Sequence, residues 1–270
     1  MVVELLPAEI MSGGYAVPDI LLACANAERI PLADDSVGLI LTSPPYNVGL
    51  NYEGYIDNLP HDEFVEFNRQ WMAEAYRVMR EGGRAYIILK DNMIWWFREI
   101  AECIGWVFSQ KLVWCKPNFI GKAGRISGDW NYMTEDILLF RKGKRTPMQS
   151  GFSTTHNWFL ETIPQSNFKE GRIHPAQLPL RLCTRIISRT PGEPILDPFA
   201  GSGSVVKAAN LLGRAAIGFD IVPSVVNRAA IRLRVGGKDG SGGLDGLPMF
   251  SAAHLDDENE GFLDEENHAF

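Results

Sequence analysis

The sequence has few of the features that mark membrane, secreted or metal-binding proteins. It contains only four cysteines in 270 residues, and these lie far apart with no CxxC pair. No run approaches the roughly 20 apolar residues that span a bilayer. The first ten residues contain two glutamates and no basic residue, unlike a secretory signal peptide. We therefore expect a cytoplasmic protein with no membrane segment, no disulfide framework and no metal site.

An overall positive charge is also lacking, because 33 acidic residues outnumber 26 Lys and Arg and give a formal net charge of −7. Nine acids and no Lys or Arg lie in residues 239–270, so the remaining 238 residues carry +2. Residues 111–189 contain thirteen Lys or Arg and five acids, a local charge of +8. The acidic, Gly-rich end predicts a flexible tail. The basic stretch predicts either a solvated surface or, if a site lies nearby, a nucleic-acid contact.

Short apolar runs alternate with helical patterns, which predicts an α/β protein with a doubly wound, mostly parallel sheet. Helices are expected at 61–80, 92–104, 177–188, 204–212 and 223–234. Strands are expected at 18–24, 37–42, 84–89, 107–113, 136–140, 194–196 and 215–219. Gly82 and Gly83 are expected to end the first helix.

The stretch LTSPPYNVG, residues 41–49, interrupts an apolar run with two prolines. Each proline lacks an amide donor and has a restricted φ, and each disfavours the α region at the residue before it. The strand must therefore end here. A hydroxyl, a carbonyl and an aromatic ring are then held in a stiff turn at the strand end, which is either a binding element or an ordinary loop.

A second stretch, ILDPFAGSGSV at residues 195–205, has the order strand, glycine turn, helix. This arrangement lets backbone amides approach a polar ligand, and Asp220, at the end of the next predicted strand, could accept hydrogen bonds from ribose hydroxyls. A purely structural turn is the alternative. The turn is shorter than GxGxxG and has no Walker lysine, which disfavours a dinucleotide or a nucleoside triphosphate. Because ligands collect at the carboxyl ends of strands, we expect both stretches to face one crevice.

TSPPYN and DPFAGSG resemble motifs of S-adenosylmethionine-dependent DNA amino-methyltransferases, and their order resembles the circularly permuted β class. The resemblance extends to residues 55–87, EDILLFRKG (135–143) and HPAQLPLRLCTRII (174–187), and covers roughly residues 17–234. It implies a Rossmann-like class I methyltransferase fold. The parts expected are a catalytic part at 1–116, a target-recognition insertion at 117–172 with one sheet strand near 136–140, a cofactor-binding part at 173–235 and an acidic tail at 236–270.

The resemblance also implies a mechanism in which the target base is flipped out of duplex DNA, because its exocyclic amine is otherwise paired. Tyr46 would stack on the base, while the Ser43 side chain and the Pro44 carbonyl would accept hydrogen bonds from the amine. The rigid pair Pro44 and Pro45 would fix these acceptors for an in-line displacement. No cysteine nucleophile in a Pro-Cys motif lies near, which argues against C5 methylation of cytosine.

Further roles follow from the same resemblance. The residues expected to bind S-adenosylmethionine are Asn26, Asp57, His174, Gln177, Asp197, Phe199, Gly201, Gly203, Ser204 and Asp220. The residues expected to contact DNA are Lys122, Arg125, Arg141, Lys142, Lys144 and Arg145. The partners implied are double-stranded DNA and, as options that the resemblance allows, a cognate restriction endonuclease acting separately and a second copy of the chain. The site of action would be the nucleoid of a prokaryotic cytoplasm.

Ser43 bears on which base is modified. Relatives with Ser-Pro-Pro-Tyr mostly modify N4 of cytosine, and those with Asp-Pro-Pro-Tyr mostly modify N6 of adenine. Leu178, where adenine-modifying members commonly have lysine, favours cytosine as well. Adenine N6 is the alternative. Two other classes stay open: a methyltransferase of protein glutamine side chains, in which the cofactor motif precedes the clamp, and a non-catalytic DNA-binding relative.

Overall fold

The most apolar strands of the chain lie at the centre of its sheet. The computed structural model describes residues 19–52, 55–90, 93–118, 133–149, 156–164, 174 and 176–235. All six residues of β2 (Val37–Thr42) are buried, as expected for a strand with neighbours on both sides and helices above and below. Within the described ranges an eight-stranded sheet has the order β1-β10-β9-β2-β5-β7-β6-β8.

The other strands of this sheet surround β2 in two groups. They are β1 (Ile20–Cys24), β5 (Met79–Leu89), β6 (Val107–Cys115), β7 (Thr134–Arg141), β8 (Trp158–Leu160), β9 (Ile195–Asp197) and β10 (Ala216–Asp220). β7 runs antiparallel to both of its neighbours, and the remaining pairs are parallel. The predicted doubly wound, mostly parallel α/β architecture is confirmed. A short hairpin of β3 (Asn51–Tyr52) and β4 (Tyr55–Ile56) lies outside this sheet.

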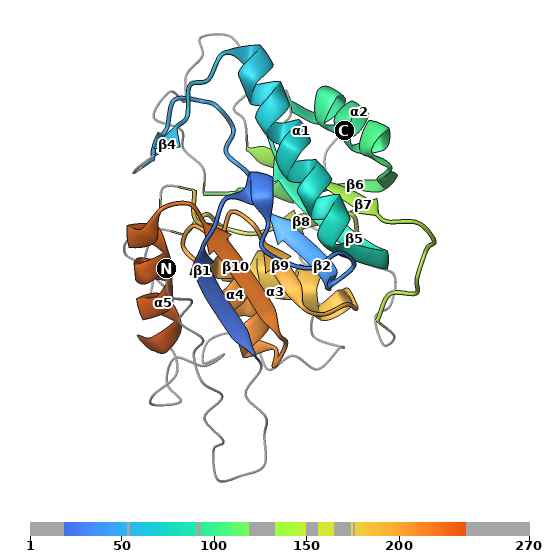
Figure 1. The fold of residues 1–270 in the computed structure, drawn as a ribbon. Helices are drawn as coiled ribbons and strands as arrows, with labels where there is room; N and C mark the ends of the chain where they lie inside the picture. Colours follow the sequence, from blue (N-terminus) through green and yellow to red (C-terminus); the bar gives the residue numbers. More distant parts are fainter. Residues whose placement is uncertain are drawn as a thin grey trace, which may run out of the picture.

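Helices cover both faces of the sheet (Figure 1). The helical elements are η1 (Ala27–Arg29), α1 (His61–Val78), α2 (Ile94–Ile104), α3 (Leu180–Arg189), α4 (Ser204–Leu211) and α5 (Pro223–Val235). One apolar cluster packs α1 and α2 onto one face, and a second packs α3, α4 and α5 onto the other. In the described ranges, none of these helices combines the length and hydropathy that crossing a bilayer requires.

Two expectations about this fold need correction. Gly82 and Gly83 do not end α1, because the helix ends at Val78 and both glycines lie within β5. The pairing of β5 with β2 shifts register between Met79 and Arg84, and Gly82 has φ +79°, so the glycines form a bulge. The second correction concerns residues 117–172, for which one sheet strand was expected. This segment contributes two strands to the sheet: β7, which lies between β5 and β6, and β8, which pairs with β6.

The order of the strands creates a crevice beside β2 and β9. The chain continues from β2 to β5 on one side of the sheet, and from β9 to β10 on the other. Two neighbouring parallel strands whose connections diverge leave space between their carboxyl ends, which is where open α/β sheets bind ligands. The Ser43–Tyr46 segment, hereafter the clamp, follows β2 directly. The glycine turn, residues 198–203, follows β9.

Candidate active site

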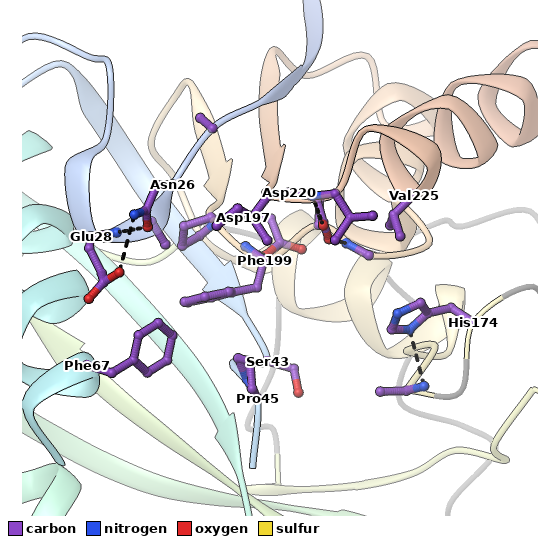
Figure 2. A pocket seen from close by; sticks show the side chains of 18 of the residues that line it. Asn26, Glu28, Ser43, Pro45, Phe67, His174, Asp197, Phe199, Asp220 and Val225 are labelled. Carbon is purple, nitrogen blue, oxygen red and sulfur yellow. Dashed lines mark hydrogen bonds between the residues drawn. The ribbon is translucent and has the colours of Figure 1, made fainter. Parts of the chain in front are cut away.

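A cavity of about 790 Å³ opens at this edge of the sheet. Its lining comes from the segments after β1, β2, β9 and β10 and from α1. The residues named earlier that line it are Asn26, Ser43, Pro45, His174, Leu178, Asp197, Phe199, Gly201, Ser204 and Asp220. Figure 2 shows Asn26 and Glu28 on one side and His174 on the other, with Phe199 and Ser43 between them. The structure thus brings the clamp and the glycine turn to one cavity.

Asp197 lies at the floor of this cavity, and its side chain is almost fully buried. It accepts hydrogen bonds from the Thr42 hydroxyl at 2.7 Å and the Phe199 amide at 3.1 Å. Thr42 ends β2, so this contact joins the carboxyl ends of the two strands that flank the crevice. Burial raises the pKa of Asp197 to about 7, although both hydrogen bonds oppose the shift.

Asp220 ends β10 and supports the glycine turn. Its two carboxylate oxygens accept hydrogen bonds from the amides of Gly201 and Val222, each at 3.0 Å. Burial raises the pKa of this carboxyl, and the two amides act in the opposite direction. A carboxylate has about four lone-pair sites, so Asp220 can still accept hydrogen bonds from a ligand in the cavity.

Asn26 and Glu28 form the wall of the cavity after β1. The Asn26 side chain caps η1 by accepting a hydrogen bond from the Glu28 amide at 2.9 Å, and its amide nitrogen lies 3.3 Å from the Glu28 carboxylate. Asn26 therefore uses its acceptor on its own turn, as an N-cap residue does. The acidic group presented at this wall is Glu28, which was not among the residues predicted from the sequence.

An aromatic cluster forms the apolar wall on the side of α1. The Phe199 ring meets Trp71 edge to face with centroids 5.2 Å apart, and it meets Phe67 at 6.0 Å. Phe67 and Phe199 both line the cavity, and Trp71 is fully buried behind them. Edge-to-face contacts of this kind fix the ring planes and leave a flat apolar surface. Phe67 was missed because it occupies an ordinary apolar position of a helix.

The clamp is held by hydrogen bonds on its inner side. The Ser43 and Tyr46 hydroxyls lie 2.9 Å apart, and the Tyr46 hydroxyl donates toward the Glu135 carboxylate at 3.0 Å and the Ile88 carbonyl at 3.2 Å. Pro44 is buried, whereas Ser43, Pro45 and Tyr46 are half-buried. In the described structure Ser43 and Pro45 line the cavity and Tyr46 does not; its side chain packs against the apolar cluster that includes α1 and α2.

Several expected cofactor residues serve the framework of the site. Asp57 accepts hydrogen bonds from the amides of Asn47, Val48 and Leu50, so it braces the loop after the clamp. Gly203 has φ +73°, caps α4 and lies against Ala229 of α5. Gln177 is buried, and its backbone amide donates to the His174 carbonyl at 3.3 Å. Among the described residues these three are not part of the cavity lining. Ser204 lines the cavity, and its hydroxyl donates to the Leu178 carbonyl at 2.9 Å.

The basic residues around 141–145 do not lie with the cavity. Because β7 is antiparallel, Arg141 pairs with Arg84 at the amino end of β5, at the opposite edge of the sheet. Lys142 binds Asp35 at 2.7 Å and the Met79 carbonyl at 2.7 Å, and the Lys144 amide binds Glu81. Arg145 is exposed in the same segment. The structure therefore gives no support for Arg141, Lys142, Lys144 and Arg145 as DNA contacts. Lys122 and Arg125 lie outside the described residues.

Metal ligation has no visible basis in the described part of the chain, where no three His, Cys, Asp or Glu side chains gather in a suitable group. The groups that line the cavity include carboxylates, backbone amides, aromatic rings and the Ser43 hydroxyl. This set can hold a polar nucleoside-type molecule beside a rigid acceptor.

Comparison with known proteins identifies the family. The DNA methylase family N6_N4_Mtase matches residues 37–231. The chain is 31% identical over 235 residues to the type II methyltransferase M.HpaI of Haemophilus parainfluenzae, covering 78% of this chain and 73% of that protein. It is 27% identical over 240 residues to the DNA adenine methyltransferase YhdJ of Escherichia coli (strain K12), covering 79% and 81% of the two chains.

Solved structures share the fold. The PvuII DNA methyltransferase (cytosine-N4-specific) has a TM-score of 0.66 and 18% identity, covering 81% of this chain and 87% of that one. The complex of M1.HpyAVI with SAM has a TM-score of 0.62 and 23% identity, covering 79% and 98%. With motifs, sheet topology and family match in agreement, this chain belongs to the N6_N4_Mtase family of DNA methylases, the DNA amino-methyltransferases.

Proposed function

We propose that the chain transfers a methyl group from S-adenosylmethionine to the exocyclic N4 of a cytosine flipped out of double-stranded DNA. The observation that carries this proposal is the shared cavity, in which Ser43 and Pro45 of the clamp face the same space as Asp197 and Asp220. A transferase needs its two substrates side by side, and these two segments lie about 150 residues apart in the chain.

The cofactor fits the residues present. A volume of about 790 Å³ lies within the range of small-molecule sites. In the described structure no ion pair neutralises the buried Asp197, which suits the ammonium of the methionine portion. Asp220 suits the ribose hydroxyls, and the Phe67 and Phe199 rings with Glu28 and Asn26 suit the adenine. When bound, the cofactor supplies a methyl group on a sulfonium sulfur, which leaves as a thioether once an amine nitrogen bonds to the methyl carbon.

The residues of this chain orient and desolvate the target. The Ser43 hydroxyl and the Pro44 carbonyl would accept the two N–H groups of the amine, which directs the nitrogen lone pair toward the cofactor side of the cavity. The two prolines restrict the backbone so that little entropy is lost in reaching this geometry. The Tyr46 ring would stack on the flipped base. No covalent enzyme intermediate is needed, and the methylated nitrogen loses one proton to solvent.

The choice of cytosine rests on Ser43 at the head of the clamp and on Leu178 in the cavity wall. Adenine N6 is the second candidate, and a specific observation favours it. YhdJ, 27% identical along most of both chains, is named a DNA adenine methyltransferase, whereas the likeness to the cytosine-specific PvuII enzyme concerns the fold. The same acceptor pair could orient either amine.

The test is incubation of the chain with isotope-labelled S-adenosylmethionine, mixed duplex DNA and a mixture of proteins, followed by digestion and mass spectrometry of the nucleosides and peptides. We expect labelled N4-methylcytosine. Labelled N6-methyladenine would overturn the base assignment and leave the reaction class in place. Label on protein glutamine instead of DNA would support that alternative, and no transfer at all would support a non-catalytic DNA-binding protein.

Two further proposals concern partners. The type II methyltransferases M.HpaI and M.BglII among the relatives support a restriction endonuclease that recognises the same sequence and acts separately. Lys122 and Arg125 remain proposed phosphate contacts of the segment between β6 and β7.

A further inference from the structure

Next to the clamp, an ion pair between the residue after β6 and the second residue of β7 contacts the Tyr46 hydroxyl. Lys116 follows β6, and Glu135 is the second residue of β7. The Lys116 ammonium lies 2.8 Å from one Glu135 oxygen, and the side chains are only 7% and 17% exposed. The other Glu135 oxygen accepts the hydrogen bond from Tyr46 at 3.0 Å. A chain of contacts therefore runs from Lys116 through Glu135 and Tyr46 to Ser43.

The direction of the protons in this chain follows from which groups can donate. A tyrosine hydroxyl has one proton, and a carboxylate or a backbone carbonyl can only accept. The Tyr46 proton therefore points to Glu135 or to Ile88, and it does not point to Ser43. The contact of 2.9 Å between the two hydroxyls must then be donated by Ser43 to the Tyr46 oxygen.

This direction determines what Ser43 offers to the cavity. Once its proton is committed to Tyr46, the Ser43 oxygen presents only lone pairs. An N–H donor is bound well by such a group, whereas a carbonyl or another acceptor in the same position is repelled. The polarity of the hydroxyl thus distinguishes an amino group from a keto group at the point of transfer.

We propose that Lys116 and Glu135 are positioning residues that fix the Ser43 hydroxyl as an acceptor for the target amine, an inference that rests on the proposed function. Lys116 holds the Glu135 carboxylate in place, and Glu135 keeps the Tyr46 proton directed away from Ser43. Neither residue needs to touch the base or the cofactor. Neither was singled out from the sequence, because 89 residues separate Tyr46 from Glu135.

A neighbouring ion pair provides the matched control. Asp136, the next residue of β7, is buried and binds Lys111 of β6 at 2.9 Å. Successive side chains of a strand point to opposite faces, so Asp136 lies on the other face of the same sheet from Glu135. Asp136→Asn and Glu135→Gln make the same carboxylate-to-amide change in the same strand pair, and only Glu135→Gln touches the clamp.

The experiment measures methyl transfer to duplex DNA by the full chain at saturating cofactor. Glu135→Gln and Tyr46→Phe should each lower kcat by about tenfold, the size expected for one hydrogen bond to a charged group. KM for the cofactor should stay unchanged, and Asp136→Asn should keep wild-type kcat. Because Glu135→Gln removes the charge partner of the buried Lys116 ammonium, kcat is measured well below the melting temperature of every variant. In the Tyr46→Phe background, Glu135→Gln should cause no further loss, because Glu135 acts through the hydroxyl. Lys116→Arg should retain more activity than Lys116→Met.

Three results would overturn the inference: wild-type kcat in Glu135→Gln, the same loss in Asp136→Asn, or a full additional loss in the Tyr46→Phe background. A second readout separates this failure from failure of the proposed function. In protein with isotope-labelled tyrosine, the Tyr46 resonance, assigned by its disappearance in Tyr46→Phe, should shift in Glu135→Gln and not in Asp136→Asn. If Glu135→Gln shows this shift and the wild-type protein does not methylate DNA, the hydrogen-bond chain is present and its role in methyl transfer is refuted.

Discussion

The two sides of the cavity hold their carboxylates in different ways. Asp197 and Asp220, at the ends of β9 and β10, are satisfied by backbone amides and by the Thr42 hydroxyl. Glu135, beneath the clamp, is satisfied by the ammonium of Lys116. Neutral donors do not cancel the charge of a carboxylate, so its ionised form can attract a cation or accept hydrogen bonds from ligand hydroxyls. A paired carboxylate is a fixed acceptor that orients its neighbours. In the proposed function, Asp197 and Asp220 therefore bind the cofactor, whereas Glu135 orients the hydroxyls of the clamp.

The sharpest test of this division is removal of the clamp itself. Ser43→Ala combined with Tyr46→Ala removes the amine acceptor and a base stack worth about 1–3 kcal/mol, so turnover should fall by about 100-fold or more. Calorimetry should show unchanged cofactor affinity. Equally weakened cofactor binding would show that the two sides are not separate.

The reciprocal variant on the binding side is Asp220→Ala. It removes the proposed acceptor for the ribose and the anchor of the Gly201 amide. Cofactor affinity should fall by about 1.5–3 kcal/mol, the cost of losing a hydrogen bond to a charged group. Calorimetry is the measurement, and the double clamp variant is its control. Wild-type affinity would remove Asp220 from the cofactor site.

A smaller effect concerns pH and the buried Asp197. The pKa of Asp197 is about 7 in the folded chain, whereas its ordinary value, which applies to the unfolded chain, is 3.8. At pH values between these two, the folded state binds more protons than the unfolded state. The free energy of unfolding without cofactor should therefore decrease as pH rises from about 4 to about 7. Denaturant titrations should show that Asp197→Asn flattens this decrease. An identical pH profile in the variant would contradict the raised pKa.

The smallest effect is expected at the far edge of the sheet. Neutralising Lys144 and Arg145 should leave the salt dependence of DNA affinity unchanged, because their segment lies at the amino end of β5, away from the cavity. Neutralising Lys122 and Arg125 should flatten the log–log slope by about two units, one for each phosphate that the variant no longer neutralises. Fluorescence anisotropy over a range of salt concentrations distinguishes the two pairs. A flatter slope in the Lys144 and Arg145 variant, with no change in the Lys122 and Arg125 variant, would indicate that DNA binds at the edge of the sheet opposite the cavity.

Local sequence patterns predicted most of the helices and strands in their correct order. Strand β2 and helix α1 begin where their apolar patterns predicted, and the two prolines end β2 at the expected residue. The Gly82–Gly83 bulge escaped prediction because a glycine pair after a helical pattern normally marks a helix end, whereas here the next strand pairs directly with β2. Glu28 could have been found as the acidic residue nearest the end of β1. Phe67 had no signal beyond an apolar helix position.

The clamp and the glycine turn are specified locally, because proline and glycine restrict or free the backbone at the positions where they stand. The family is equally readable from the chain, through motifs that are continuous in it. The charged side chains that contact these motifs are determined instead by how the strands pair in the tertiary structure. The antiparallel course of β7 places Glu135 at the clamp and Arg141 at the opposite edge, although only five residues lie between them in the chain. Strand direction is set by pairing with β5 and β6, a long-range contact that no local pattern encodes.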